Sequence, residues 1–512
     1  MQGKHILLVQ PPLLKSEMDV DCIQKIYWQE LTSRILQALI ARKTETVAYE
    51  YKESYTHYDQ NYTGFVEPNI GLLYIAAQLD EAGHEVRYCD LHLKDAEIRN
   101  EGNRPISIED IENELNNQIT EETVIVGISP LTVNYSWAAK IASIVKNINA
   151  NAIVVLGGVH ASFDYERILK EDQAVDVVVI GEGEETIVEL AGALSMEGFS
   201  DKSLEGIRGI AYRGPRNAVR VTPQRDFIAY LDGLQYPKYD LLPETYQANS
   251  IRRVLTARGC NNSCSFCVPS AFFRGLRYRD PVKVVDEIEY FYNVQNCRVF
   301  MIGDLNYSSD IEHASRVCRE LIDRELDILW MCQSRVDLIN PEIAELMEES
   351  GCVMVMLGIE SAEQGLLDTS GKNIFVEQSL KACKMVKDAG MLLFTFWVFG
   401  LPGETHESAH RSIMLLREML DKDLIDYTHC TVCVPYPGTR LHENPDDFEI
   451  RIVSDNFDDY WMGCDLYGAG PAVLETEELS SIEIYAYWQM ALATVAGNIN
   501  RRLNRRGPEV QR

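Results

Sequence analysis

The chain has 512 residues, of which 46% are apolar and 25% charged, and its net charge is −30. This length accommodates two or three globular domains, each with a core of its own. The strong negative charge disfavours nucleic acid and anionic membrane surfaces as partners, and no apolar run reaches the roughly 18 residues that predict a membrane span.

The N-terminal segment and the cysteines indicate the compartment. The first apolar run, which follows His5, is short and lacks a small-residue cleavage site, so it predicts a strand and not a signal peptide. The 13 cysteines are irregularly spaced, and an odd number of them fits a reducing environment. We therefore expect a cytoplasmic protein.

Residues 1–200 alternate short apolar runs with amphipathic segments, which predicts an α/β domain with a doubly wound, Rossmann-like parallel sheet. The expected strands are His5–Val9, Glu85–Cys89, Val124–Ile128, Ile153–Leu156 and Val175–Ile180, and the expected helices are Leu72–Glu81, Trp137–Asn147 and Glu184–Ser195. Residues 13–66 break this alternation and include a predicted helix, Ile23–Arg42. An insertion of this length suggests a cover over the ligand-binding face.

Several turns at the carboxyl ends of these strands are rich in glycine and hydroxyl groups, namely residues 129–132, 157–160 and 181–184. Ligands bind such sheets at this edge, and glycine there leaves room for a large ligand and exposes backbone N–H donors. Ordinary strand-to-helix turns explain the same residues equally well.

Residues 201–250 are interpreted as a linker that carries a β-hairpin, Ile207–Arg213 and Ala218–Pro223. Residues 251–440 then repeat a strand and a helix six times, short of the eight repeats of a closed barrel. The expected strands are Val254–Ala257, Val299–Ile302, Ile328–Cys332, Val353–Leu357, Leu392–Val398 and Tyr427–Val434. We predict an open, partial (β/α)6 barrel, followed by a small, mostly helical substrate cap over residues 441–512.

Three cysteines follow the first barrel strand with the spacing C-x3-C-x2-C: Cys260, Cys264 and Cys267. Three thiolates on one short loop can bind three irons of a 4Fe–4S cluster and leave the fourth iron open to a substrate. Gly259 lets the chain turn out of the strand. The alternative is that three buried cysteines have this spacing by chance. It is disfavoured by the apolar strand before the loop, by Gly259 and by the aromatic Phe266.

The cysteine spacing, with the aromatic Phe266 beside the third ligand, resembles the radical S-adenosylmethionine (SAM) enzymes. In that family the open iron chelates the amino and carboxylate groups of SAM. The reduced cluster then cleaves SAM to methionine and a 5′-deoxyadenosyl radical. The resemblance implies this chemistry, together with an external electron donor of the flavodoxin or ferredoxin type.

The resemblance also implies which residues contact SAM. Arg335, after the third strand, would bind the carboxylate, and an ion pair with Asp337 is the alternative. Ser361 could bind the amino group or ribose, although it also suits a helix N-cap. The turn after the fifth strand would pack the adenine. The expected contacts are Phe266, Arg335, Glu360, Ser361, Gly400 and Pro402.

The N-terminal turns resemble the cobalamin-binding domain of one branch of this family. The resemblance implies cobalamin contacts at Gly71, Ser129, Leu131, Thr132, Gly157, Gly158, His160, Gly181, Glu182 and Gly183. One departure concerns the Asp-x-His-x-x-Gly pattern that supplies a histidine below cobalt, because Gln10–Leu14 contain no histidine. His92 has half of the pattern at a later strand, and we interpret it as a loop histidine.

The two resemblances together imply a cobalamin-dependent methyltransferase. Its radical would activate an unreactive carbon, which would then take a methyl group from methylcobalamin. A cyclase, ring contractase or rearrangement enzyme with the same cofactors is one alternative, and a non-enzymatic cobalamin carrier or sensor is another. The acidic composition and the lack of a basic patch favour a small-molecule substrate, such as a natural-product precursor.

Overall fold

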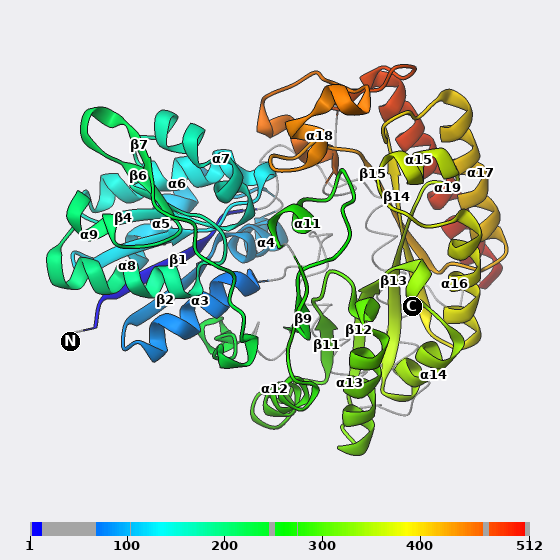
Figure 1. The fold of residues 1–512 in the computed structure, drawn as a ribbon, viewed down its shortest axis with the longest axis horizontal. Helices are drawn as coiled ribbons and strands as arrows, with labels where there is room; N and C mark the ends of the chain where they lie inside the picture. The colour runs from blue at the N-terminus through cyan, green and yellow to red at the C-terminus, as the bar shows by residue number, and fades with distance from the viewer. Residues whose placement is uncertain are drawn as a thin grey trace. The chain divides into compact units, whose positions relative to one another are not determined.

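The computed structural model describes residues 3–12, 68–102, 104–244, 251–273, 275–463 and 470–506. The described residues up to 244 form one compact unit and those from 251 onward form a second (Figure 1). The predicted insertion, residues 13–66 with the helix Ile23–Arg42, lies outside the described residues.

The first unit is built on a seven-stranded sheet in the order β2-β1-β3-β4-β5-β6-β7. Its strands are β1 (His5–Gln10), β2 (Glu85–Asp90), β3 (Thr123–Ile128), β4 (Ile153–Leu156), β5 (Val177–Val179), β6 (Ile210–Arg213) and β7 (Val219–Val221). The first five are parallel, and β6 pairs antiparallel with both β5 and β7. The predicted hairpin therefore extends this sheet and belongs to the first unit, although it was assigned to a linker.

The helices of the first unit are α3 (Ile70–Glu81), α4 (Leu91–Gly102), α5 (Ile108–Gln118), α6 (Tyr135–Ile148), α7 (Gly158–Glu171), α8 (Glu184–Glu197) and α9 (Asp201–Glu205). Helices α3 and α8 pack together, as do α5 and α6. Right-handed crossovers on either side of β1 place these two pairs on opposite faces of the sheet. The doubly wound architecture is thus confirmed, with its topological switch point between β1 and β3, where such sheets bind ligands.

Four of these helices, α4, α5, α7 and α9, were not predicted from the sequence. Helix α4 begins at Leu91, directly after β2, because the Asp90 carboxylate accepts a hydrogen bond from the Leu93 N–H (2.9 Å). No Gly or Pro marks that boundary. Helix α5 starts with a capping box in which Ser107 and Asp110 each accept a hydrogen bond from the other's backbone N–H (3.2 and 2.8 Å).

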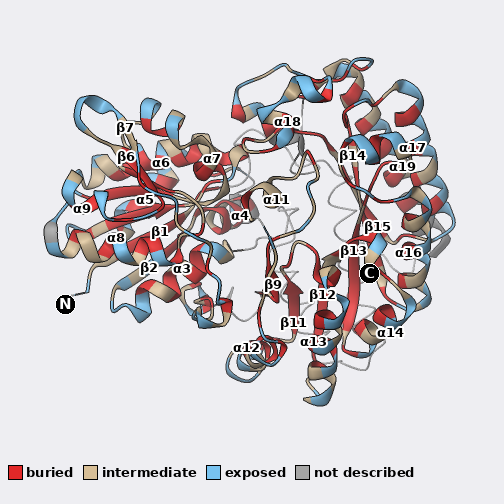
Figure 2. Cartoon of the chain, viewed as in Figure 1, coloured by how far each residue is buried: buried red, intermediate tan, exposed pale blue. Residues whose placement is uncertain are grey.

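The second unit is a six-stranded parallel sheet in the order β8-β11-β12-β13-β14-β15. Its strands are β8 (Arg252–Val254), β11 (Val299–Ile302), β12 (Leu329–Ser334), β13 (Cys352–Glu360), β14 (Leu392–Phe399) and β15 (Tyr427–Val432). The edge strands β8 and β15 do not pair with each other in the described sheet, which confirms the open (β/α)6 barrel. The strand cores are buried, and their helices expose one side (Figure 2).

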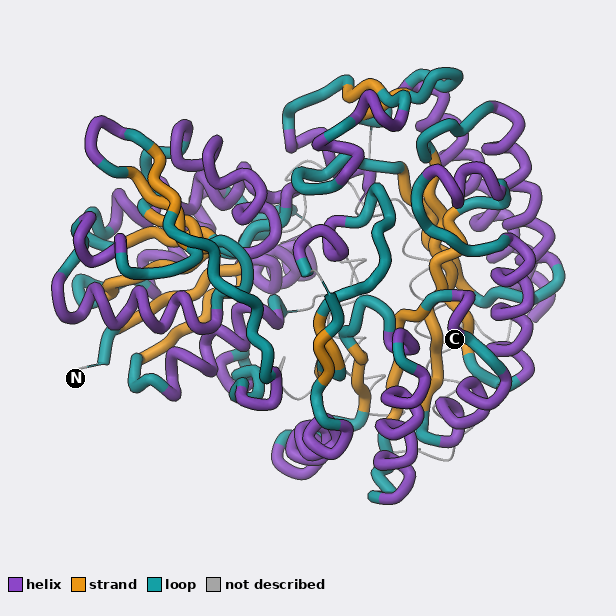
Figure 3. Tube along the Cα trace, in the orientation of Figure 1, coloured by secondary structure: helices purple, strands orange, loops and turns teal. Residues whose placement is uncertain are grey.

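The main helices of this unit are α12 (Pro281–Val294), α13 (Ile311–Asp323), α14 (Pro341–Glu349), α15 (Gln364–Thr369), α16 (Val376–Asp388), α17 (His406–Asp421) and α19 (Ser481–Arg506). They succeed one another around the outside of the strands (Figure 3). Helix α19 packs against α17 and β15, and the Trp488 indole donates a hydrogen bond to the Cys430 carbonyl (2.7 Å). The helical C-terminal part is confirmed, whereas its role as a substrate cap stays a prediction.

Candidate active site

The three cysteines follow the short strand β9 (Ala257–Arg258) and are half-buried free thiols. Backbone hydrogen bonds of the buried Ser265 hold their loop from two distant segments. The Ser265 N–H donates to the Ser370 carbonyl (2.8 Å), and the Ser265 carbonyl accepts from the Leu441 N–H (3.2 Å). The loop therefore has a fixed course at the end of the first barrel strand.

Gly259 sets the direction in which this loop leaves β9. Its φ is +103°, and a Cβ atom built there would lie 1.7 Å from the Gly275 carbonyl oxygen. The close approach arises because β9 pairs with the antiparallel strand β10 (Arg277–Tyr278). Only glycine satisfies both the backbone conformation and the contact.

Replacement of Gly259 by alanine should destabilise the second unit by about 3 kcal/mol and reduce its iron content, because strain and a backbone clash add. Gly275→Ala is the matched control: its φ is +73° but nothing lies within 4 Å of the added Cβ, so it should cost about 1 kcal/mol. Urea unfolding and iron analysis after reconstitution measure both effects. Equal losses of stability and of iron in the two variants would contradict the clash assigned to Gly259.

The cysteine loop fits a cluster better than a single ion. Among the residues that the structure describes, no three His, Cys, Asp or Glu side chains are grouped to hold one metal ion. In a 4Fe–4S cluster each thiolate binds its own iron, so the thiols need only border a common space. The Cys260 sulfur already accepts hydrogen bonds from the Asn262 side chain (3.3 Å) and backbone (3.5 Å). Such N–H donors suit a metal-bound thiolate.

Burial raises the pKa of Cys264 to about 11, whereas the nearby cations Lys372 and Arg335 act in the opposite direction. The free thiol is therefore protonated at neutral pH. Coordination to iron deprotonates a thiol outright, and the two cations favour the resulting negative charge. The electrostatic surroundings thus suit an anionic metal centre on this loop.

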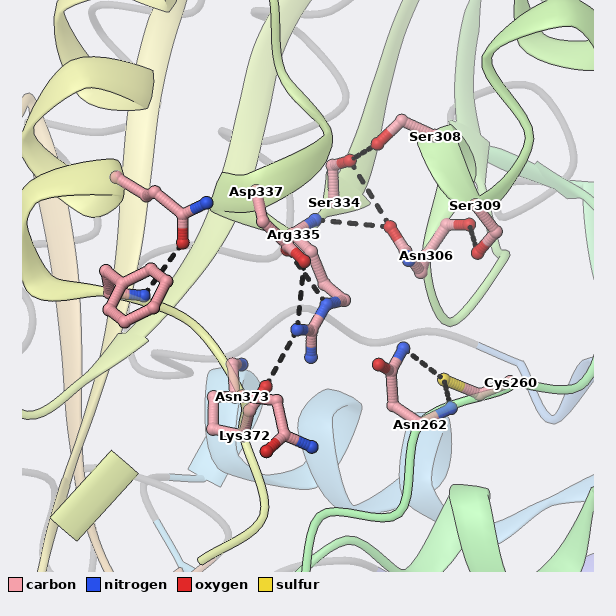
Figure 4. A network of polar contacts seen from close by, with 12 residues as sticks. Cys260, Asn262, Asn306, Ser308, Ser309, Ser334, Arg335, Asp337, Lys372 and Asn373 are labelled. Atoms are coloured by element: carbon pink, nitrogen blue, oxygen red, sulfur yellow. Dashed lines mark hydrogen bonds and ion pairs between the residues drawn. The ribbon is translucent and has the colours of Figure 1, made fainter. Parts of the chain in front are cut away.

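Arg335 and Lys372 belong to a buried network of charges (Figure 4). Lys372 Nζ lies 2.5 Å from a carboxylate oxygen of Glu360, and Arg335 donates to the Lys372 carbonyl (2.7 Å) and to Asp337 (3.0 and 3.2 Å). Arg335 thus forms the ion pair considered as the alternative; Arg335 itself is buried, whereas Asp337 is exposed. Its Nη1 has no partner among the described residues. A Cβ at Gly358 would lie 2.3 Å from the Glu360 carboxylate, so glycine makes room for the network.

Removal of the Lys372 charge should be costly because Glu360 would stay buried without a counter-ion. We expect Lys372→Met to lower the free energy of unfolding by about 3 to 5 kcal/mol. Lys384→Met, which removes an exposed ion pair with Asp388, should change it by less than about 1 kcal/mol. Chemical denaturation of the two variants measures this difference. Similar losses in the free energy of unfolding for both substitutions would contradict the role assigned to the buried charge.

Asn306 is a site residue that the sequence analysis missed. Its side-chain oxygen accepts hydrogen bonds from the Arg335 N–H (3.2 Å) and the Ser334 hydroxyl (3.4 Å), and its buried Nδ2 has no partner among the described residues. Figure 4 shows the Arg335 guanidinium between Asn306 and Lys372, with Cys260 and Asn262 on the neighbouring loop. The strand-end rule could have found Asn306, because it follows β11.

The other expected SAM contacts have defined positions. The Ser361 hydroxyl is buried, accepts from the Glu363 N–H (3.1 Å) and contacts the Ser412 hydroxyl (3.2 Å), which are structural partners. Gly400 has a φ of +83°, and its N–H donates to the buried Glu404 carboxylate. Pro402 is buried and Phe266 half-buried. Their contacts with SAM stay predictions.

In the first unit, polar contacts link the carboxyl ends of β1 and β3 at the switch point. The Asn69 N–H donates to the Gln10 side chain (2.7 Å), and Asn69 Nδ2 donates to the Ser129 hydroxyl (3.3 Å). Asn69 also caps α3, which places Gly71 in the exposed first turn of this helix. A single edge therefore carries several of the residues expected to contact cobalamin.

Four expected glycines line the turns after β4 and β5. Gly158 begins α7 with a φ of +88°, and a Cβ there would lie 2.8 Å from the Ser129 hydroxyl. Gly157 has ordinary extended backbone, and its added Cβ would meet only Val179, at 3.7 Å. Nothing lies within 4 Å of a Cβ at Gly181, whereas one at Gly183 would touch Ile75 (3.3 Å). The open space at Gly181 and the absence of a close contact at Gly157 fit the approach of a large ligand.

His160 and Glu182 already have protein partners. His160 lies in the first turn of α7, where the sequence predicted only a turn, and its Nδ1 contacts the Thr132 hydroxyl (3.2 Å). Burial lowers the pKa of His160 to about 3, so it is neutral. The Glu182 carboxylate accepts from the Ile228 N–H (2.8 Å). Leu131, by contrast, is exposed. The contacts of these residues with cobalamin stay predictions.

His92 is not a loop histidine, which corrects the expectation. It is the second residue of α4 and is buried, and burial lowers its pKa to about 4. The sequence was misleading because α4 follows β2 without a turn. The absence of a histidine below cobalt stays a prediction.

Two family models match the chain, the B12 binding domain over residues 61–191 and the radical SAM superfamily over residues 254–416. An uncharacterized methyltransferase of Pyrococcus horikoshii, PH0819, is 34% identical over 385 residues, which are 74% of this chain and 79% of that protein. The chain belongs to the cobalamin-dependent radical SAM enzymes. Its cofactors are accordingly a 4Fe–4S cluster, SAM and cobalamin.

Other members of the cobalamin-dependent radical SAM enzymes share the fold or part of the sequence. The methyltransferase TsrM from Kitasatospora setae, solved with cobalamin and a [4Fe-4S] cluster, superposes with a TM-score of 0.67 at 17% identity, covering 97% of this chain and 89% of TsrM. The anaerobic magnesium-protoporphyrin IX monomethyl ester cyclase of Rubrivivax gelatinosus is 32% identical over 63% of this chain, which spans 58% of the cyclase. No described helix is long and apolar enough to cross a membrane.

Proposed function

We propose that this cobalamin-dependent radical SAM enzyme is a methyltransferase that acts on an unactivated carbon of a small molecule. The observation that carries the proposal is the 34% identity with a methyltransferase along 79% of that protein's length. Both cofactor-binding regions lie within the shared architecture of one chain. The electron donor is proposed to be a flavodoxin or ferredoxin.

The buried network beside the cysteine loop supports a binding role for SAM. Arg335 Nη1 and Asn306 Nδ2 are donors without described partners, and a guanidinium pairs well with a carboxylate. Glu360 offers a negative charge for the amino group of SAM. When bound, the cluster supplies the reductive cleavage of SAM and cobalamin supplies the methyl group.

The protein's own contribution is to hold and orient these groups. Glu360 has a φ of +65°, which is unusual for a residue other than glycine, and its pair with Lys372 fixes the carboxylate in place. Fixed charges in a buried site orient a zwitterionic ligand without reorganisation when the reaction occurs. The buried charges thus have a defined task in the proposed reaction.

A cyclase or rearrangement enzyme is the second candidate, and the identity with the Rubrivivax gelatinosus cyclase favours it. Mass spectrometry of products formed with methyl-deuterated SAM separates the two. A product that carries one trideuterated methyl group is expected for the methyltransferase. A product with an unchanged carbon count would contradict it and support the cyclase. A carrier or sensor would retain its function in a Cys264→Ala variant.

A further inference from the structure

The sheet of the second unit has two faces of different character. Trp330 and Cys332 face the outer helices, because the Trp330 indole donates to the Ser350 carbonyl after α14 (3.0 Å) and Cys332 interacts electrostatically with Cys318 of α13. Side chains alternate along a strand, so Met331 and Gln333 lie on the opposite side. We call that side the inner face.

Strand register extends the inner face across the barrel. Met301 pairs with Met331, Met331 with Met354, Met356 with Phe394, and Phe396 with His429. The rings of Phe394 and Phe396 are 5.1 Å apart, and those of Phe396 and His429 are 6.2 Å apart. The residues of the inner face used here are Met301, Met331, Met354, Met356, Phe394, Phe396 and His429. Thioether and aromatic groups dominate this surface.

His429 is a polar residue on this mostly apolar surface, as are Gln333 and Tyr427. Burial lowers its pKa to about 4, so the imidazole is neutral, and the buried Nε2 has no hydrogen-bond partner among the described residues. His313, a buried histidine of the same unit, instead uses its Nε2 to contact the Arg279 carbonyl (2.9 Å). An unpaired buried polar group is unfavourable unless a ligand completes it.

The inner face is continuous with the site at the carboxyl ends of the strands. Gly358 pairs with Phe396 in the sheet, and the Glu360 carboxylate lies over Gly358. The Glu360–Lys372 pair in turn interacts with Cys264. The charges of this pair compensate each other, and Arg253 lies at the far edge on β8. Between Arg253 and this pair, no inner-face residue that the structure describes and that is named above carries a charge.

We propose that the inner face binds the substrate of the proposed methyltransferase, and that this substrate is a neutral, largely apolar molecule whose one hydrogen-bonding group meets His429. The inference rests on the proposed function for the identity of the occupant. Methionine sulfur and phenylalanine rings favour a planar, unsaturated ligand. A charged group would lose its hydration there without a counter-ion.

Three probes of nearly equal shape test this class: 2-naphthol, naphthalene and 2-naphthoate. Their dissociation constants are measured by ligand-observed NMR with the reconstituted full-length holoenzyme. We expect 2-naphthol to bind about tenfold more tightly than naphthalene, because its hydroxyl pairs with His429, and 2-naphthoate to bind most weakly. The methyl signals of ¹³C-labelled Met331 and Met356 should shift on addition of 2-naphthol.

Variants of His429 test whether this residue causes the tighter binding of 2-naphthol relative to naphthalene. His429→Phe should reduce the tenfold ratio to about one, and His429→Gln, which retains a donor and an acceptor, should restore most of it. His410→Phe, on the exposed face of α17, is the control and should leave the ratio unchanged. A ratio that persists in His429→Phe, equal binding of 2-naphthoate, or no binding of any probe would overturn the inference. If the probes bind in the expected order but no methylated product forms, only the proposed methyltransferase activity is contradicted.

Discussion

Replacement of Cys264 by alanine is expected to reduce the release of 5′-deoxyadenosine from SAM by at least about a thousandfold, because one iron of the cluster would lose its ligand. Cys260→Ala and Cys267→Ala should do the same. The wild-type protein, reconstituted without oxygen, should bind about four irons, and the visible absorption should bleach with dithionite.

Cys383→Ala provides the matched control for these variants. Cys383 is buried in α16, and burial raises its pKa to about 12, so it is an inert thiol far along the chain from the loop. This variant should retain both iron and SAM cleavage. A normal rate of 5′-deoxyadenosine release from any of the three loop variants would show that the cluster is assigned to the wrong residues.

Gly157→Val is expected to weaken cobalamin binding by about tenfold to a hundredfold and to leave the iron content unchanged, because its side chain would take up room that the bound cobalamin is expected to need. The backbone at Gly157 accepts any residue, and the nearest atom to an added Cβ is 3.7 Å away. Cobalamin retained after gel filtration, measured by its absorption spectrum, and the melting temperature are the two measurements.

The structure also shows why Gly157 is a cleaner target than Gly158. A side chain at Gly158 would strain a left-handed backbone and press on the Ser129 hydroxyl, so loss of cobalamin there would be mixed with loss of stability. Gly192→Ala, in the middle of α8 with nothing near the added Cβ, is the control and should bind cobalamin normally. Unchanged affinity in Gly157→Val would move the cobalamin site away from this turn.

The strands were predictable because their cores are short, continuous apolar runs between turn residues. The C-x3-C-x2-C loop was predictable because its ligands are adjacent in the chain. Helix α4 was not, since it starts directly after β2 and its residues are mostly polar. The charge network was only partly predictable. Arg335 follows β12 and Glu360 ends β13, whereas Lys372 lies in a loop after α15 and its pairing depends on tertiary packing.

The two hydrogen bonds of Ser265 have a consequence for how the molecule is made. The cysteine loop leaves the ribosome long before Ser370 and Leu441, whose backbone groups hold it in its final course. Until the sixth barrel strand has been synthesised, the loop lacks half of these restraints, and domains complete their folding only as whole units. Insertion of an iron–sulfur cluster into this loop should therefore follow the synthesis of the sixth barrel strand, which makes it a late step in the making of this enzyme.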